Sequence, residues 1–398
     1  YQEKAILSNP YDIIFYINLA NTYNFLGKFL LSKLFLEYAL LIDENNEFAL
    51  ISYVRILFIL KNYHKVFLIF EKLISVTSNS YNFKYKVEFF ERLIDLEKIN
   101  EAKKILSKID LEKNNEDLIK VLYLQGILKK AENNYDEAKT IFQRCLEIDK
   151  KFVNAYIALA SIYKNENNFS ECINLLNKAI GIDRENSKAL LELGIIYSHL
   201  GEVKKGISLL KKSLVIDPLN HETKFNLSQM QIYCKELEEG WVNFRSRWYY
   251  HNFKSVPFKS SKKQLTNLNE LRNVFIWAEQ GIGDQIMYGS IFSEISKLSK
   301  NVTVKFDKRL IKIFERKHKN INFIDNNTEI NEEQYDAHLP LGDLGYFFRK
   351  DVESFNKVNF PYIDVNEKIC LKVKSTYHNQ NKIIVGISWT SKNEEIGQ

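Results

Sequence analysis

The feature that most constrains this chain is a repeat of 34 residues within its first 250 residues. Asp149, Asp183 and Asp217 stand 34 residues apart. Aligning the sequence on these aspartates makes other positions coincide: Leu159 with Leu193 and Leu227, Ala160 with Gly194 and Ser228, and Phe142 with Leu176, Leu210 and Phe244. A period of this length with small residues at fixed places predicts pairs of short helices. One pair cannot bury its apolar faces alone, so neighbouring pairs share a continuous core.

This period and its column of small residues resemble the tetratricopeptide repeat. The resemblance implies a helical solenoid of about seven repeats over residues 1–250. The third repeat, near residues 77–113, is irregular, because Ala102 matches the Ala138 column only if two residues are inserted. The last repeat carries the tryptophan-rich segment Gly240–Trp248, which resembles an end cap.

The first helix of each repeat is expected to face a concave groove that binds a protein partner. By repeat geometry the groove residues are Asn18, Asn21, Ala158, Ser161, Glu192, Asn226 and Gln229. Only Asn18 and Asn226 share the column in which an asparagine ladder would grip a peptide backbone. The pattern therefore favours a general protein-binding or spacer solenoid.

Charge and cysteine content exclude several classes of function. The formal net charge of +6 is spread over 56 basic and 50 acidic residues without a long basic run, so neither a nucleic acid nor a membrane surface is indicated as a partner. No apolar stretch reaches the roughly 18 residues of a membrane span. The cysteines lie far apart, at Cys145, Cys172, Cys234 and Cys370, which predicts free thiols in a reducing, cytoplasmic setting and no zinc site.

A different pattern begins after the repeats. Residues 251–269 are predicted to be a linker, and residues 270–365 alternate short strands with helices, which favours a parallel sheet covered by helices. The expected strands are 274–277, 302–306, 321–324 and 335–339, and the expected helices are 284–298, 309–317 and a short one after Leu341. Residues 366–398 are predicted to be an interdomain segment followed by the strand 382–389.

The segment Val274–Met287 reads as a strand, a tight glycine turn and a helix. Gly281 and Gly283 flank one residue, and a turn of this kind presents backbone N–H groups and the positive end of a helix to a negatively charged ligand. One alternative is a dinucleotide fingerprint with Asp307 as its acidic residue. That motif needs a third glycine at position 286, where this chain has Ile286.

The second alternative comes from a resemblance. The stretch Ala278–Asp284 is similar to the first turn of heptosyltransferase-like glycosyltransferases (GT-B, glycosyltransferase family 9-like), and to bacterial proteins that fuse tetratricopeptide repeats to such a domain. Tyr335–Gly345, Pro361–Ile363 and Val385–Trp389 fit the same family in the same order. The resemblance implies two facing Rossmann-like halves. The second half would lie past Gln398, so the fragment is expected to be inactive alone.

The same resemblance implies roles for individual residues. Asp284 would be the catalytic base, although its position alone favours a helix cap. Glu279, Gln280, Gly281 and Gly283 would contact substrate, with solvated loop and turn roles as the alternatives. His338 would bind substrate, although a structural histidine is the commoner case. Ser391 and Lys392 would contact donor phosphate, or simply belong to a surface loop.

The resemblance implies transfer of a sugar from a nucleotide sugar to a hydroxyl of a glycan or protein, and no cofactor or metal is expected. The solenoid would then bind a protein or position the acceptor. The alternative is a non-catalytic interaction scaffold whose α/β domain is degenerate. A dehydrogenase that uses NAD is the third possibility.

Overall fold

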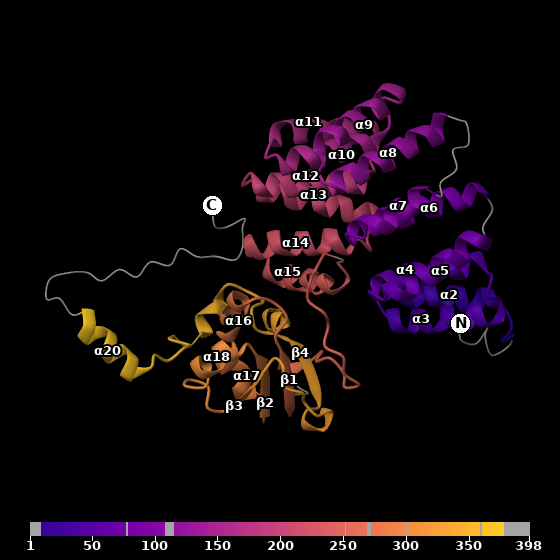
Figure 1. Ribbon diagram of the computed structural model, residues 1–398. Helices are drawn as coiled ribbons and strands as arrows, with labels where there is room; N and C mark the ends of the chain where they lie inside the picture. Colours follow the sequence, from indigo (N-terminus) through magenta and orange to yellow (C-terminus); the bar gives the residue numbers. More distant parts are fainter. Residues whose placement is uncertain are drawn as a thin grey trace. The chain divides into compact units, whose positions relative to one another are not determined.

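The computed structural model describes residues 9–76, 79–107, 115–250, 252–268, 272–298, 301–358 and 360–377 (Figure 1). The chain divides into two compact units. The first comprises Tyr1–Pro257 with Arg349–Val352, and the second comprises Phe258–Phe348 with Glu353–Gln398.

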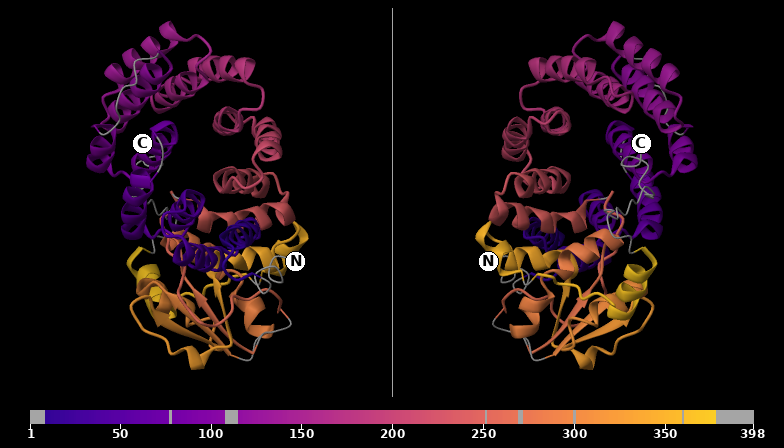
Figure 2. Two further views of the ribbon diagram at one scale, coloured as in Figure 1. Left: turned by 90° about the vertical axis from the view of Figure 1, so that its right-hand side faces the viewer. Right: turned by 90° about the vertical axis from the view of Figure 1, so that its left-hand side faces the viewer.

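The first unit is built from helix pairs stacked side by side (Figures 1 and 2). In its described residues the pairs are α2 (Ile13–Phe25) with α3 (Phe29–Ile42), α4 (Glu47–Ile59) with α5 (Tyr63–Val76), α6 (Asn79–Asp95) with α7 (Ile99–Ser107), α8 (Asn115–Ala131) with α9 (Tyr135–Ile148), α10 (Val153–Asn165) with α11 (Phe169–Ile182), α12 (Ser187–His199) with α13 (Val203–Ile216), and α14 (His221–Tyr233) with α15 (Leu237–Phe244). A 3-10 helix, η1 (Arg245–Tyr249), follows α15. The expected helical solenoid is confirmed.

Each pair turns through one residue with a positive φ angle. These residues are Gly27, Lys61, Glu97, Asn133, Asn167, Gly201 and Lys235. Their spacing is 34 residues except on both sides of Glu97, where it is 36. The third repeat is therefore irregular because it has two extra residues before its turn and two more after it. The repeat frame itself continues through it.

Replacing a lysine at one of these turns is expected to stabilise the solenoid. Lys235 is exposed at φ 64°, a conformation that costs a residue with a side chain about 1–2 kcal/mol. Lys235→Gly should raise the unfolding free energy by about 0.5–1 kcal/mol, because it relieves this cost. The gain is smaller than the full cost, since the glycine loses more chain entropy on folding. Gly201→Lys at φ 83° should lower it by about 1–2 kcal/mol. Urea denaturation of both variants measures the two changes in unfolding free energy, which should have opposite signs. Changes of the same sign would refute the turn assignment.

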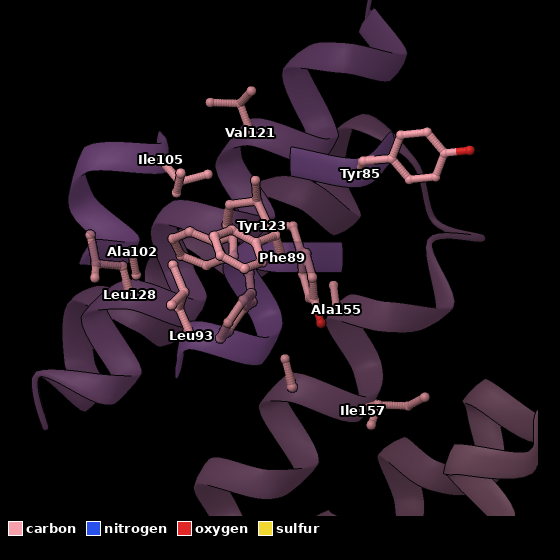
Figure 3. Close-up of a cluster of buried hydrophobic side chains, with 14 of the residues drawn as sticks. Tyr85, Phe89, Leu93, Ala102, Ile105, Val121, Tyr123, Leu128, Ala155 and Ile157 are labelled. Carbon is pink, nitrogen blue, oxygen red and sulfur yellow. The ribbon is translucent and has the colours of Figure 1, made fainter. Parts of the chain in front are cut away.

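The core of the solenoid follows the predicted columns. Leu159, Leu193 and Leu227 are buried, as the repeat alignment predicted. One apolar cluster runs continuously from Ala20 to Ile196, and a second joins Leu191 with residues of the last two pairs. Figure 3 shows part of the first cluster, where side chains of α6, α7, α8 and α10 meet. Burial between pairs therefore holds the repeats together.

The first and last pairs of this unit also contact each other. The ring of Phe29 in α3 lies 6.1 Å from the ring of His221 and 4.6 Å from that of Tyr249. Lys61 donates a hydrogen bond of 2.8 Å to the backbone carbonyl of Phe253. The repeats that lie furthest apart in sequence are thus linked by aromatic packing.

This contact should make stability depend on pH. Nδ1 of His221 is buried without a hydrogen-bond partner in the described residues, and burial lowers the pKa of the imidazole to about 4. The unfolded chain takes up this proton near pH 6.5, so stability is full above that pH and falls as the pH drops toward 4. We expect the unfolding free energy to fall by about 1–2 kcal/mol between pH 7 and pH 4, a figure that allows for solvent screening. Urea denaturation of the parent and of His221→Phe at pH 7 and pH 4 checks it. The expectation would be contradicted if the parent lost no more unfolding free energy between pH 7 and pH 4 than the variant does.

The second unit is a four-stranded parallel sheet in the order β3-β2-β1-β4. The strands are β1 (Asn273–Trp277), β2 (Asn301–Phe306), β3 (Ile321–Asp325) and β4 (Ala337–Pro340). The helices α16 (Ile282–Gly289), α17 (Phe292–Leu298) and α18 (Lys308–Phe314) connect the first three strands. The 3-10 helices η3 (Glu332–Gln334), η4 (Leu341–Asp343) and η5 (Glu353–Lys357), with α19 (Leu344–Phe348) and α20 (Glu367–Tyr377), complete the described elements. The expected parallel sheet is present.

Two expectations for this unit need correction. The helix expected over residues 284–298 begins at Ile282 and is two helices, because α16 ends at Gly289. A Cβ at Gly289 would lie 2.4 Å from the ring of Phe314, so this glycine allows α16 to approach α18 closely. The segment after Phe258, expected to be part of a linker, instead pairs with β4 through Gln264 and His338 and packs Phe258 against Phe275.

None of the helices in the described part of the chain is both long and apolar enough to cross a membrane.

Candidate functional site

The carboxyl ends of β1 and β4 form the first candidate site. These strands are neighbours, and the chain order reverses between them, which is where ligands bind in open parallel sheets. Glu279 follows β1 and is nearly buried, and its carboxylate accepts a hydrogen bond of 2.6 Å from the N–H of Gly342 after β4. Glu279 therefore joins the two strand ends and is not a solvated loop residue.

The glycine turn has a different geometry from the one expected. Gly281 caps α16 with φ −65°, and Gly283 lies inside the helix, so neither needs the left-handed conformation. A Cβ at Gly283 would meet nothing within 4 Å, and one at Gly281 would lie 3.6 Å from the carboxylate of Asp284. Both glycines are exposed. The fold itself does not require either glycine, and together they leave the start of α16 open to a ligand.

Asp284 lies in the first turn of α16 and is not its N-cap, which is Gly281. Its half-buried carboxylate accepts hydrogen bonds from the backbone N–H groups of Gly281 and Asp284. Burial raises the pKa of this carboxyl, and those two hydrogen bonds oppose the rise. The side chain thus occupies donors that a phosphate would use at a helix N-terminus. An anionic ligand has to displace it, whereas a neutral hydroxyl can meet it as a proton acceptor.

Gln285 holds this turn in place and was not singled out from the sequence. It is buried, its side-chain amide donates to the carbonyl of Gln280 at 3.0 Å, and its Oε1 accepts from the N–H of Asp307 at 2.9 Å. One side chain therefore fixes the loop after β1 and the loop after β2. The sequence offers no signal for this role, because the two partners lie 5 and 22 residues away along the chain.

His338, in β4, contacts the last residue of β1. Its Nδ1 is 3.2 Å from the indole N–H of Trp277, and its ring packs edge-on against Phe258. Burial lowers the pKa of this histidine. This arrangement fits a structural role for His338, in which the neutral imidazole accepts a hydrogen bond inside the unit. Asp343 is also buried, and it accepts a hydrogen bond of 3.1 Å from Gln264.

The acidic residue of the dinucleotide alternative has local partners. Asp307 caps α18 by accepting from the N–H of Arg309, and its two carboxylate oxygens also accept from the Arg309 guanidinium. The hydrogen bonds from Arg309 lower the pKa of Asp307 to about 2. The glycine that permits close helix packing is Gly289, one turn beyond the position that the motif requires. Binding a ribose would require Asp307 to give up this ion pair.

Ser391 and Lys392, expected to contact phosphate, lie outside the described residues, as does the strand expected at 382–389. The described residues contain no group of three or more His, Cys, Asp or Glu side chains able to hold a metal ion. All four cysteines are free thiols, and burial raises the pKa of Cys145 and Cys172 to about 11.

The second candidate site is the surface formed by the first helices of the repeats. Cations on one first helix reach the next: Arg55 pairs with Glu88 at 2.8 Å, Lys130 donates to Ser161 at 2.7 Å, and Lys164 pairs with Glu192 at 2.7 Å. Of the expected groove residues, Asn18, Asn21 and Gln229 are exposed, Ser161, Glu192 and Asn226 are half-buried, and Ala158 is buried. Consecutive first helices therefore form one surface with polar side chains available to a partner.

Comparisons with known proteins concern the solenoid. A family model described as tetratricopeptide repeat matches residues 130–180. A tetratricopeptide repeat protein from Parabacteroides merdae ATCC 43184 is 18% identical, with 58% of this chain and 90% of that chain covered and a TM-score of 0.46. Yeast Tom70 is 17% identical, with 62% of this chain and 53% of that chain covered and a TM-score of 0.45. A chain of the APC/C hetero-tetramer Cut9–Hcn1 is 14% identical, with 57% of this chain and 44% of that chain covered and a TM-score of 0.37.

This chain therefore spans less than half of the chain it matches in Cut9–Hcn1 and about half of Tom70. No curated protein matches it. The structural likenesses do not bear on function. The family match and the helix pairs make residues 130–180 a tetratricopeptide repeat within a tetratricopeptide-repeat-like helical solenoid.

Proposed function

We propose that this chain is a protein-interaction scaffold in which the first-helix surface of the solenoid binds the partner. The observation that supports this most is the contact between successive first helices, from Arg55–Glu88 to Lys164–Glu192, because it makes one continuous surface out of separate repeats. In the α/β unit, by contrast, Glu279 and His338 are engaged in internal hydrogen bonds. Free thiols at all four cysteines fit a reducing compartment, and we place the scaffold in the cytoplasm.

Site-specific photo-crosslinking tests this proposal. A photoreactive residue in place of exposed Gln229, on first helix α14, should crosslink a defined protein in extract of the native cell. The matched control carries it at exposed Lys178, on second helix α11. The scaffold proposal expects the crosslinked band from position 229 only. A band of equal intensity from both positions, or from neither, would contradict it.

We propose as a second function the transfer of a sugar from a nucleotide sugar to a hydroxyl of a glycan or protein. One observation favours it: Gly281 and Gly283 leave the start of α16 open without being required by the fold. Asp284 would accept the proton of the attacking hydroxyl, and Glu279 and Gln280 would shape the turn around the donor. This function requires the second Rossmann-like half that the resemblance implies, with Ser391 and Lys392 contacting the donor phosphates.

A further inference from the structure

A cavity of about 260 Å³ lies within the N-terminal part of the solenoid unit. Its walls come mainly from α4, α5 and α6, with Asn24 of α2 and Tyr249 of η1 also among the lining residues, and they are largely apolar. Ile51, Val54, Phe58, Ile59, Phe89 and Tyr249 are among the lining residues. An engineered apolar cavity of about 150 Å³ is enough to bind benzene. This cavity therefore has room for a large aromatic side chain.

The repeat frame explains why a cavity forms at this place. Seven residues before each positive-φ turn, five of the seven pairs in the described residues carry a small residue: Ala20, Gly126, Ala160, Gly194 and Ser228. The second and third pairs carry Val54 and Phe90 there, and both are buried. Small residues let paired helices approach closely, whereas valine and phenylalanine hold them apart. The extra volume lies beside these two pairs.

The edge of the cavity carries positive charge. Arg55 donates two hydrogen bonds, of 2.9 and 2.8 Å, to the carboxylate of Glu88, so these two charges cancel. Arg92, one turn further along α6, is exposed and has no side-chain partner in the described residues, yet it lines the same cavity. Five residues before the turn, five other pairs bury an apolar residue: Ile56, Leu128, Ile162, Ile196 and Met230. Within the part of the chain that the structure describes, an exposed guanidinium without a side-chain partner therefore stands beside an apolar hollow, at a position where other pairs bury an apolar side chain.

We propose that this cavity binds the aromatic side chain of a partner peptide whose adjacent residue is Asp or Glu. The proposal rests on the scaffold function and names the chemistry of its partner. The ring leaves water for the apolar walls, and Arg92 pairs with the neighbouring carboxylate, to which a planar guanidinium offers two parallel hydrogen bonds. Trp, Tyr and Arg are enriched among the few residues that carry most of the binding energy in protein interfaces.

A random dodecapeptide library selected on the whole chain tests this proposal. Enriched peptides should contain Trp, Phe or Tyr next to Asp or Glu. A synthetic peptide of the enriched sequence should lose about tenfold or more in affinity when Arg92 is changed to Glu, which corresponds to about 1.4 kcal/mol. Ile59→Trp, which fills the cavity from a half-buried position, should lose binding as well. The exposed Arg144→Glu on α9 is the matched control and should bind normally.

A second selection on Arg92→Glu should replace the acidic residue by Lys or Arg and keep the aromatic one. Circular dichroism verifies that each variant is folded. A selection without enrichment, or enriched peptides that bind Arg92→Glu and Ile59→Trp as well as they bind the parent, would overturn the inference. The scaffold proposal would still stand in that case if position 229 crosslinks a partner, because that assay reports on the whole first-helix surface.

Discussion

Gly206→Ala is expected to lower the unfolding free energy by about 1–3 kcal/mol, although alanine is normally the better helix residue. A Cβ at Gly206 in α13 would lie 2.7 Å from the backbone carbonyl oxygen of Gly194 in α12 and 3.2 Å from the sulfur of Met230. A backbone oxygen has no rotamer freedom to avoid the clash, so the two helices have to move apart. That movement weakens packing on both sides of the pair.

Gly181→Ala is the matched control, because the same change is made in helix α11 where a Cβ would meet nothing within 4 Å. It should raise the unfolding free energy by about 0.5–1 kcal/mol through helix propensity alone. Urea denaturation followed by far-ultraviolet circular dichroism measures both variants. Stabilisation by both changes would mean that α12 and α13 are not in the contact described here.

The second large effect concerns Asp284 in a protein that carries both Rossmann-like halves, and it rests on the transferase proposal. Asp284→Asn keeps an oxygen that can accept from the N–H of Gly281, but it cannot take a proton from the attacking hydroxyl. Sugar transfer should fall by on the order of 10²–10⁴-fold. Because burial raises the pKa of Asp284, the ionised carboxylate costs stability at pH 7. The neutral asparagine should therefore be no less stable than the parent.

Asp284→Ala separates the two roles of the side chain. It removes the proton acceptor and also the hydrogen bonds at the start of α16, so it should lose turnover together with roughly 0.5–1.5 kcal/mol of stability. Sugar transfer and thermal melting of both variants are measured side by side. Near-normal turnover in Asp284→Asn, with a merely less stable Asp284→Ala, would leave Asp284 with a structural role only.

The sequence predicted the solenoid well because its signal is repeated. The columns of Leu159 and Ala160 recur in several repeats, and errors in one repeat are corrected by the others. Even the two-residue insertion inferred at Ala102 agrees with the 36-residue spacing around Glu97. The positive-φ turns were not predicted, because Lys61, Glu97 and Lys235 do not favour that conformation.

The α/β site was harder to predict, because its contacts join residues that are distant in sequence. Glu279 bonds to Gly342, and Gln285 bonds to Asp307, and no local pattern pairs these positions. Local rules also placed Asp284 at the helix cap, whereas α16 starts two residues earlier at Ile282. The strand order β3-β2-β1-β4 decides which loops meet, and order is a property of the whole sheet.

Hydrogen exchange of the whole chain, with and without the protein captured by crosslinking from position 229, tests the scaffold account most directly. The account predicts that bound partner slows exchange most in the first helices of the solenoid, with residues 273–348 unchanged. Slower exchange confined to residues 273–348, around the glycine turn and the end of β4, would contradict it and place the binding function in the α/β unit.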